Sequence, residues 1–158
     1  MAIQNTAKHS VFVFIRHGDR DIDPLTSDNG LTDKGRRQAQ ILAELYQSGT
    51  LPSAAEFWSS PKQRCLETIK PLALKAGFQV KVQIDLDEKQ SGESQVEFLN
   101  RIERLLSRAE NAGTTVYFCS HGDWIPEAIG LLGSQLALSL EKGQFSILEK
   151  TSNHWRMR

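Results

Sequence analysis

The sequence of residues 10–18 is SVFVFIRHG, and the fold can be worked out from this stretch. After its first residue it is β-branched and aromatic up to Ile15, with no alternation of apolar and polar residues. A strand that is covered on both faces has this pattern, because both of its sides must be apolar. We therefore predict a central strand that ends at Ile15 and is followed directly by Arg16, His17 and Gly18.

A polar stretch follows this strand. From Arg16 to Leu31 it is rich in Asp, Gly, Pro, Ser and Asn, and it has neither helical nor strand periodicity. A loop of this length in a compact domain usually carries a function. Thr32 can then cap a helix that ends at Gly49. Four positions with helical spacing form the apolar stripe of this helix: Ala39, Leu42, Ala43 and Tyr46.

Further strands and helices alternate along the rest of the chain. Apolar runs between turn residues predict strands over residues 55–59, 78–84, 114–119, 144–149 and 154–157. Start and stop signals predict helices from Ser60 and Pro61 to Gly77, from Ser94 to Gly113, and from Trp124 to Leu132.

Three of these elements have distinctive residues. Pro71 lacks a backbone N–H, so we expect the helix that contains it to kink or break near Lys70. Ser94 and Glu97 form a capping box at the start of another helix. The alternation of apolar and polar residues over 78–84 predicts a half-buried strand near an edge of the sheet.

The order of these elements indicates the fold class. Strands that alternate with helices favour a three-layer α/β domain, with helices on both faces of a mostly parallel central sheet. The chain has 158 residues, which is near the usual size of one domain. No repeat and no linker rich in Pro, Gly or Ser divides it. We therefore expect residues 1–158 to form a single domain.

The composition excludes several classes of function. The 19 Lys and Arg residues balance 19 Asp and Glu residues, so the formal net charge is zero. The chain therefore lacks the bulk attraction to nucleic acids and acidic membranes that basic proteins have. The longest apolar run, from Val11 to Ile15, is too short to span a bilayer or to act as a secretory signal. We expect a cytoplasmic protein that binds neither nucleic acid nor membrane.

The two cysteines match no known pattern of a site. Cys65 and Cys119 lie far apart in the sequence and have neither zinc-binding nor redox spacing. Free cysteine is mostly a small core residue. We expect two reduced, partly buried thiols.

Chemically versatile residues collect at the predicted carboxyl ends of the strands. In a parallel α/β sheet, ligands bind in the crevice beyond those ends. The candidates are Arg16, His17 and Gly18 after the first strand, Ser59, Ser60, Pro61 and Arg64 after the second, Asp85, Asp87 and Glu88 after Ile84, and Ser120, His121 and Gly122 after a later strand. If these strands are parallel, histidines, arginines and carboxylates meet at one rim of the sheet.

This set of residues resembles the histidine phosphatase superfamily, which is also called the phosphoglycerate mutase-like family. The resemblance extends from Val11 to Leu148, with the motifs in the order of the family. The motifs are Arg16-His17-Gly18, Leu31-Thr32-x-x-Gly35-x-x-Gln38-Ala39, Ser59-Ser60-Pro61-x-x-Arg64-x-x-x-Thr68, Gly92-Glu93-Ser94 with Arg101, and Ser120-His121-Gly122. The resemblance implies a phosphoglycerate mutase-like αβα sandwich, and phosphoryl chemistry on a histidine without a metal or another cofactor.

Physical chemistry gives a role to the charged and titratable members of these motifs. A neutral imidazole is a competent nucleophile toward phosphorus, so His17 is the predicted nucleophile. Phosphoryl transfer develops charge on the equatorial oxygens, and fixed cationic donors stabilise that charge. Arg16, Arg64 and a protonated His121 are predicted to supply these donors.

Glycines and a carboxylate complete the predicted site. Gly18 and Gly122 directly follow the two histidines, and we expect their backbone to approach the phosphate because they carry no side chain. One carboxyl group can protonate the leaving oxygen and then accept a proton from water. Glu88, which has the Leu-x-Glu context of the family, is predicted to be this acid and base. Four other carboxylates could also reach the site: Asp87, Asp85, Glu93 and Asp19.

Departures from the family pattern bear on the substrate. Mutases of the family usually carry Thr and Asn where this chain has Arg20 and Asp23, and insertions roof their site. Here only nine residues separate Ile84 from Ser94. An open site favours hydrolysis, because water reaches the phosphohistidine easily. The compact size is also similar to that of the small bacterial phosphohistidine phosphatases.

We therefore expect a phosphatase that hydrolyses phosphomonoesters or protein phosphohistidine, so that its partner is a phosphorylated small molecule or a phosphoprotein. Two alternatives stay open: a phosphoglycerate mutase-type phosphotransferase, and a catalytically silent module that binds phosphate. The charged loop from Asp19 to Asp23 either meets a charged substrate or is simply solvated. The oligomeric state has no signal in the sequence.

Overall fold

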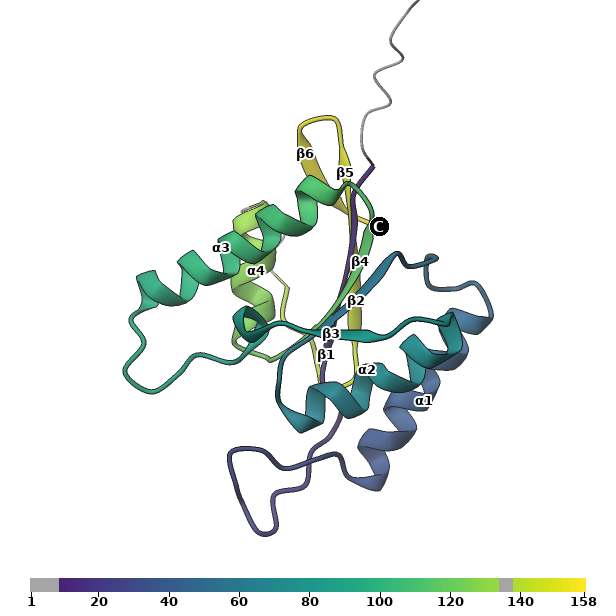
Figure 1. Cartoon of the computed structure of the whole chain (residues 1–158), viewed down its shortest axis with the longest axis vertical. Coiled ribbons are helices and arrows are strands. Elements are labelled where there is room, and N and C mark those ends of the chain that lie inside the picture. The colour runs from purple at the N-terminus through teal and green to yellow at the C-terminus, as the bar shows by residue number, and fades with distance from the viewer. Residues whose placement is uncertain (1–8, 134–137) are drawn as a thin grey trace, which may run out of the picture.

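The predicted central strand, β1 (Val11–Arg16), lies in the interior of a six-stranded sheet. The structure is a computed structural model that describes residues 9–133 and 138–158 (Figure 1). β1 pairs in parallel with β4 (Thr115–Ser120) and in antiparallel orientation with β5 (Phe145–Thr151). Both edges of β1 are therefore hydrogen-bonded to other strands.

Three further strands complete the sheet. β2 (Glu56–Ser59) pairs in parallel with β4 and with β3 (Val80–Val82), whereas β6 (His154–Met157) is antiparallel to β5. The order across the sheet is β3-β2-β4-β1-β5-β6. The first four strands in this order are parallel, which confirms the prediction of a mostly parallel central sheet.

Helices cover both faces of the sheet. α1 (Asp33–Gln47) and α2 (Gln63–Ala76) lie on one side, and α3 (Gln95–Ala112) and α4 (Trp124–Leu132) lie on the other, as Figure 1 shows. The predicted three-layer sandwich is thus confirmed. Among the described residues, no helix combines the length and the apolar character that crossing a membrane requires.

Alternate side chains of β1 supply the two halves of the core. Phe12 and Phe14 belong to the apolar cluster on the side of α3 and α4, with ring centroids 5.0 and 5.2 Å from that of Phe118. Val13 and Ile15 belong to the cluster on the side of α1 and α2. Successive side chains of a strand point to opposite faces, so the unbroken apolar sequence of β1 is what burial on both faces requires.

Two predicted helix starts are confirmed by their caps. The Thr32 hydroxyl accepts a hydrogen bond from the Gly35 N–H at 3.1 Å, where α1 begins. At the start of α3, the Ser94 hydroxyl accepts from the Glu97 N–H at 3.1 Å, and the Glu97 carboxylate accepts from the Ser94 N–H at 2.7 Å. These side chains replace the partners that the first turn of a helix lacks.

The start of α2 differs from the prediction, and of the two outcomes expected at Pro71, a kink or a break, the break does not occur. Its N-cap is Lys62 instead of Ser60, whose hydroxyl contacts the ring of His121. Pro71 does not break the helix, which continues to Ala76. Proline removes only one backbone hydrogen bond, and buried side chains on both sides of it hold the helix on the sheet.

β3 and the cysteines also correct the sequence analysis. β3 contains only three residues, and a short 3₁₀ turn follows it. It lies at an edge of the sheet, as predicted, but the side chains of Val82 and Ile84 are exposed instead of half-buried. A period of two identifies which residues share a face, and it does not show whether a neighbouring element covers that face. Cys65 and Cys119 are reduced and are fully buried, not partly buried.

Gly35→Ala should destabilise the protein. A Cβ atom at this position in α1 would lie 2.1 Å from the backbone oxygen of Asp19, so the helix and the loop after β1 would have to separate. We expect the free energy of unfolding, measured by urea denaturation, to fall by about 1–3 kcal/mol. The matched control is Gly130→Ala in α4, where no described atom lies within 4 Å of the added Cβ. Equal stabilities for the two variants would contradict the expected clash.

Candidate active site

A cavity of about 390 Å³ opens where β1 and β4 end. Its lining residues are Arg16, His17, Arg20, Arg64, Glu88, His121, Gly122, Asp123 and Lys142. The structure therefore brings the predicted site residues together, with the exception of Gly18. In the parallel pair, Arg16 lies opposite Ser120, so the histidines that follow are neighbours, with ring centroids 5.4 Å apart.

His17 is held in one tautomer by the backbone. Its Nδ1 lies 2.8 Å from the carbonyl oxygen of Gly18. Because a carbonyl oxygen can only accept, Nδ1 must carry the hydrogen, and the neutral ring then has its lone pair on Nε2. Burial lowers the pKa of His17 to about 4, and the positive charges of Arg64 and Arg16 contribute to the shift. His17 is therefore neutral at pH 7 and has the form that a nucleophile requires.

Burial also favours the neutral form of His121, whereas the role predicted for it in phosphoryl transfer uses the protonated imidazole. Burial and then the charge of Arg64 lower its pKa to about 2. An Arg64 Nη2 hydrogen points to Nδ1 at 3.2 Å, so this nitrogen accepts. Nε2 then carries the proton and donates to the Ser60 hydroxyl at 2.8 Å. In the free protein, His121 fixes Arg64 and Ser60 instead of contributing a cation.

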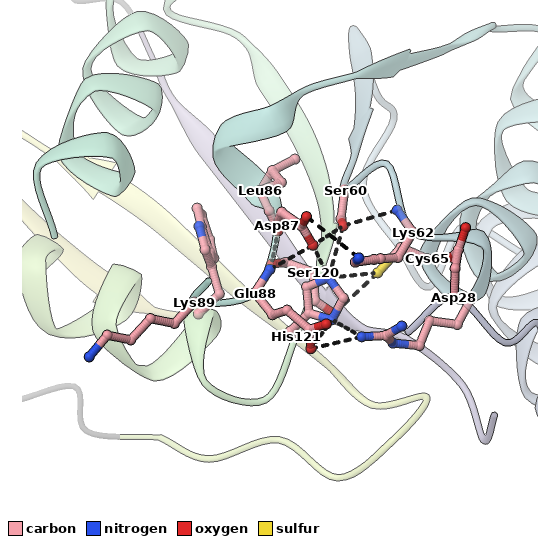
Figure 2. A network of polar contacts seen from close by, with 12 residues as sticks. Asp28, Ser60, Lys62, Cys65, Leu86, Asp87, Glu88, Lys89, Ser120 and His121 are labelled. Carbon is pink, nitrogen blue, oxygen red and sulfur yellow. Dashed lines mark hydrogen bonds and ion pairs between the residues drawn. The ribbon is translucent and has the colours of Figure 1, made fainter. Parts of the chain in front are cut away.

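A short chain of polar groups holds His121 from behind. Figure 2 shows the Ser60 hydroxyl between the ring of His121 and the carboxylate of Asp87. The Ser60 oxygen lies 3.4 Å from Asp87 Oδ1, which also accepts from the Glu88 N–H at 2.9 Å. Asp87 therefore connects the orientation of His121 to the backbone position of Glu88.

Arg16 and Arg64 both carry a buried donor that is not satisfied within the described residues. Arg16 Nη1 donates to the Leu140 carbonyl at 2.8 Å, and Arg64 Nη2 donates to Glu88 at 2.8 Å. The Nε atom of each guanidinium group has no hydrogen-bond partner among the residues that the structure describes. A buried donor without a partner is unfavourable. Both arginines line the cavity, where an anion would meet cationic hydrogen-bond donors.

The Gly18 N–H has another partner than the predicted phosphate, whereas Gly122 lines the cavity and also has a packing role. The Gly18 N–H donates to the Thr68 hydroxyl at 2.9 Å, so this donor is already used. A Cβ at Gly18 would also lie 3.0 Å from the Gly35 carbonyl oxygen, which indicates a packing role. A Cβ at Gly122 would lie 2.8 Å from Cζ of Arg16. Gly122 therefore gives the Arg16 guanidinium the space that it occupies.

Glu88 is the one predicted acid and base that lines the cavity. Its Oε2 accepts from Arg64 and lies 3.9 Å from Nδ1 of His121. The four other candidates lie outside the cavity lining: Asp87 behind His121, Asp85 beside Arg104, Glu93 on Arg101, and Asp19 on Lys142. Position in the cavity therefore favours Glu88 over these four.

The sequence analysis missed two lining residues. Asp123 directly follows the Ser-His-Gly motif, and that adjacency could have suggested it. Lys142 comes just before β5 and lies outside every motif, so no local signal could have found it. It forms an ion pair with Asp19 at 3.3 Å, which joins the segment before β5 to the loop after β1.

Comparisons with known proteins identify related sequences and folds. A sequence model of the histidine phosphatase superfamily (branch 1) matches residues 12–95, which are more than half of the chain. A search of curated proteins gave no match.

Several solved structures share the fold. A mycobacterial glucosyl-3-phosphoglycerate phosphatase superposes with a TM-score of 0.78 at 19% identity, over 93% of this chain and 96% of that chain. A phosphoserine phosphatase from Entamoeba histolytica gives a TM-score of 0.74 at 19% identity, over 94% of each chain. A phosphoglycerate mutase from Bacillus anthracis gives 0.78 at 15% identity, over 95% of this chain and 92% of that chain. At these identities, the superpositions show a shared fold.

The tautomer and the protonation of His17 can be measured by long-range ¹H–¹⁵N NMR. We expect a neutral ring with its proton on Nδ1 at pH 7, and protonation only near pH 4. Because the pKa of His17 in the folded state lies below its ordinary value of 6.5, the unfolded chain binds the proton first as the pH falls, and stability decreases between pH 6.5 and pH 4. The ring signals of His17 are identified as those that the wild-type spectrum contains and the spectrum of His17→Ala lacks. A midpoint near 6.5, or a proton on Nε2, would contradict the assignment.

Proposed function

The chain belongs to the histidine phosphatase superfamily, and from this premise we propose that it is a phosphatase that hydrolyses phosphomonoesters through a phosphohistidine on His17. One observation carries the proposal. A neutral histidine with an available Nε2 lone pair lines a cavity together with two arginines, each of which has a buried donor without a partner among the described residues. This combination suits a nucleophile that attacks a bound phosphoryl group.

In the first step, Nε2 of His17 attacks the phosphorus atom of the ester. The new P–N bond forms as the P–O bond to the leaving group breaks, and the leaving oxygen takes a proton from Glu88. Arg16 and Arg64 line the cavity and stabilise the charge on the equatorial oxygens through their guanidinium groups. The Nδ1–H bond to the Gly18 carbonyl stabilises the positive charge that develops on the ring.

In the second step, a water molecule attacks the phosphohistidine. Its proton passes to Glu88, the P–N bond breaks, and inorganic phosphate leaves with His17 regenerated. Glu88 is suited to both steps because it lines the cavity next to Arg64 and His121. A phosphoryl group would also bring negative charge next to His121 and favour its protonation, so this residue becomes a stronger donor when the site is filled.

The short connection before α3 favours hydrolysis over transfer to a second substrate. Only a short segment connects the 3₁₀ turn at Ile84–Leu86 to α3, and it contains Glu88. Water therefore has a short path to the phosphohistidine. A phosphohistidine side chain on a protein is a further substrate to test at such an accessible site.

His17→Ala should abolish turnover of p-nitrophenyl phosphate, with a loss in kcat of about a thousandfold or more, because both ring nitrogens of the other histidine in the cavity, His121, are already hydrogen-bonded. The wild type should form an acid-labile phosphoenzyme that His17→Ala does not form. His154→Ala, on the exposed strand β6, is the matched control and should behave as wild type. Turnover that persists in His17→Ala would contradict the proposed mechanism.

Glu88→Gln should slow the hydrolysis of an alkyl phosphate more than that of p-nitrophenyl phosphate. Only a poor leaving group needs a proton as the P–O bond breaks, and Gln cannot supply one. The measurement is kcat/KM for both substrates in both proteins. Asp123→Asn is the control, because this residue is the other carboxylate of the described cavity lining. Equal slowing of both substrates by Glu88→Gln would place the acid elsewhere.

A further inference from the structure

Arg20 lines the cavity and has no role in the phosphoryl chemistry described above. We infer that Arg20 binds a second anionic group of the substrate, a carboxylate or another phosphate, and so determines which phosphomonoesters the protein prefers. This inference rests on the proposed function, because it names the class of substrate for the same cavity.

The charges around the cavity leave Arg20 without a counterion. Four lining side chains are cationic and two are carboxylates: Arg16, Arg20, Arg64 and Lys142 against Glu88 and Asp123. Arg64 pairs with Glu88 at 2.8 Å, and Lys142 pairs with Asp19 at 3.3 Å. Arg20 forms no ion pair and no side-chain hydrogen bond with any residue that the structure describes. Its charge is thus available to a ligand.

Arg20 lies close enough to the phosphoryl site for its charge to be felt there. Burial is the main cause of the low pKa of His121, and the charge of Arg20 is among the further causes. Arg64 is almost fully buried, whereas Arg20 is half-buried. Arg20 is therefore less buried than Arg64, as Arg16 also is, and its charge is accessible to a group of the substrate beyond the phosphoryl group.

The backbone holds Arg20 in place although it belongs to a long loop. The Asp19 N–H donates to the Gln38 side chain at 2.7 Å, and the Asp21 N–H donates to the Gly30 carbonyl at 2.8 Å. Arg20 itself forms an isolated bridge with Leu31. Since the main chain is fixed on both sides, binding a ligand would order only the side chain.

The composition of the cavity agrees with a doubly anionic substrate. Its described lining contains no apolar side chain, so an aromatic or aliphatic group would gain little by binding there. With both histidines neutral, the lining has two more positive than negative charges. Arg16 and Arg64 provide donors for the phosphoryl group. The planar guanidinium group of Arg20 can donate two parallel hydrogen bonds to a second acidic group.

Two matched pairs of substrates test the inference. Glycerol 3-phosphate and 3-phosphoglycerate differ by a carboxylate, and fructose 6-phosphate and fructose 1,6-bisphosphate differ by a second phosphate. For the wild type, we expect kcat/KM to favour the more acidic member of at least one pair by about tenfold, and the pair that shows the preference identifies the acid. In Arg20→Met the ratio should fall close to one, with kcat/KM for the less acidic member of the pair changed by less than about twofold.

Two variants accompany this test. Arg20→Lys keeps the positive charge but loses the planar guanidinium group that can donate two parallel hydrogen bonds. It should therefore retain part of the preference for the more acidic substrate. Arg37→Met removes one charge from an exposed position of α1 outside the cavity lining, and it should keep the wild-type ratio.

The possible results are distinct. A ratio that is unchanged in Arg20→Met, or a wild type without preference in either pair, would overturn the inference and leave the phosphatase proposal intact. An equal loss for both members of a pair would also overturn it, because Arg20 would then bind the phosphoryl group itself. No turnover of any of these esters or of p-nitrophenyl phosphate would overturn the proposed function, and the inference with it.

Discussion

The parallel pairing of β1 with β4 is the interaction on which both the fold and the site depend. Because β1 is apolar on both faces, it must lie inside the sheet with helices on both sides. The register sets Arg16 opposite Ser120. The segments Arg16-His17-Gly18 and Ser120-His121-Gly122 therefore lie side by side where the two strands end. A shift of this register by one residue would turn the apolar side chains of β1 out of their clusters and separate the histidines. The requirement for burial and the geometry of the site are therefore satisfied by the same hydrogen-bonded pair.

The site is electrostatically unfavourable for an empty protein and favourable for an anion. Two arginines lie in the cavity with buried donors unpaired within the described residues, and their charge helps to keep both histidines neutral. Such a site lowers the stability of the fold, and the large apolar clusters on both faces of the sheet offset that loss. The neutral net charge of the chain thus conceals a small region with excess positive charge, surrounded by carboxylates.

Much of this arrangement could be predicted from the sequence. The apolar pattern of β1, the Thr32 cap and the Ser94 capping box were visible as local patterns, and so were the motifs that carry Arg16, His17 and His121. What the sequence could not show is which partner each group meets. The Gly18 N–H is used by Thr68 and the Ser60 hydroxyl by His121, and both contacts join segments far apart in the chain. Protonation depends on burial and neighbouring charge, so the sequence could not show that the pKa of His121 is lowered. Lys142 enters the site only through the return of the chain to β5.

The close approach of Gly122 to Arg16 connects the evolution of two segments that are distant in sequence. Any side chain at position 122 would occupy the space of the guanidinium group, so the residues allowed there depend on which residue is present at position 16. The two positions are consequently expected to be epistatic, so that the effects of their substitutions do not add. A lineage that lost Arg16 would be free to replace Gly122, and recovery of the arginine would then require that replacement to be reversed first. Loss of this arginine would therefore become progressively harder to undo.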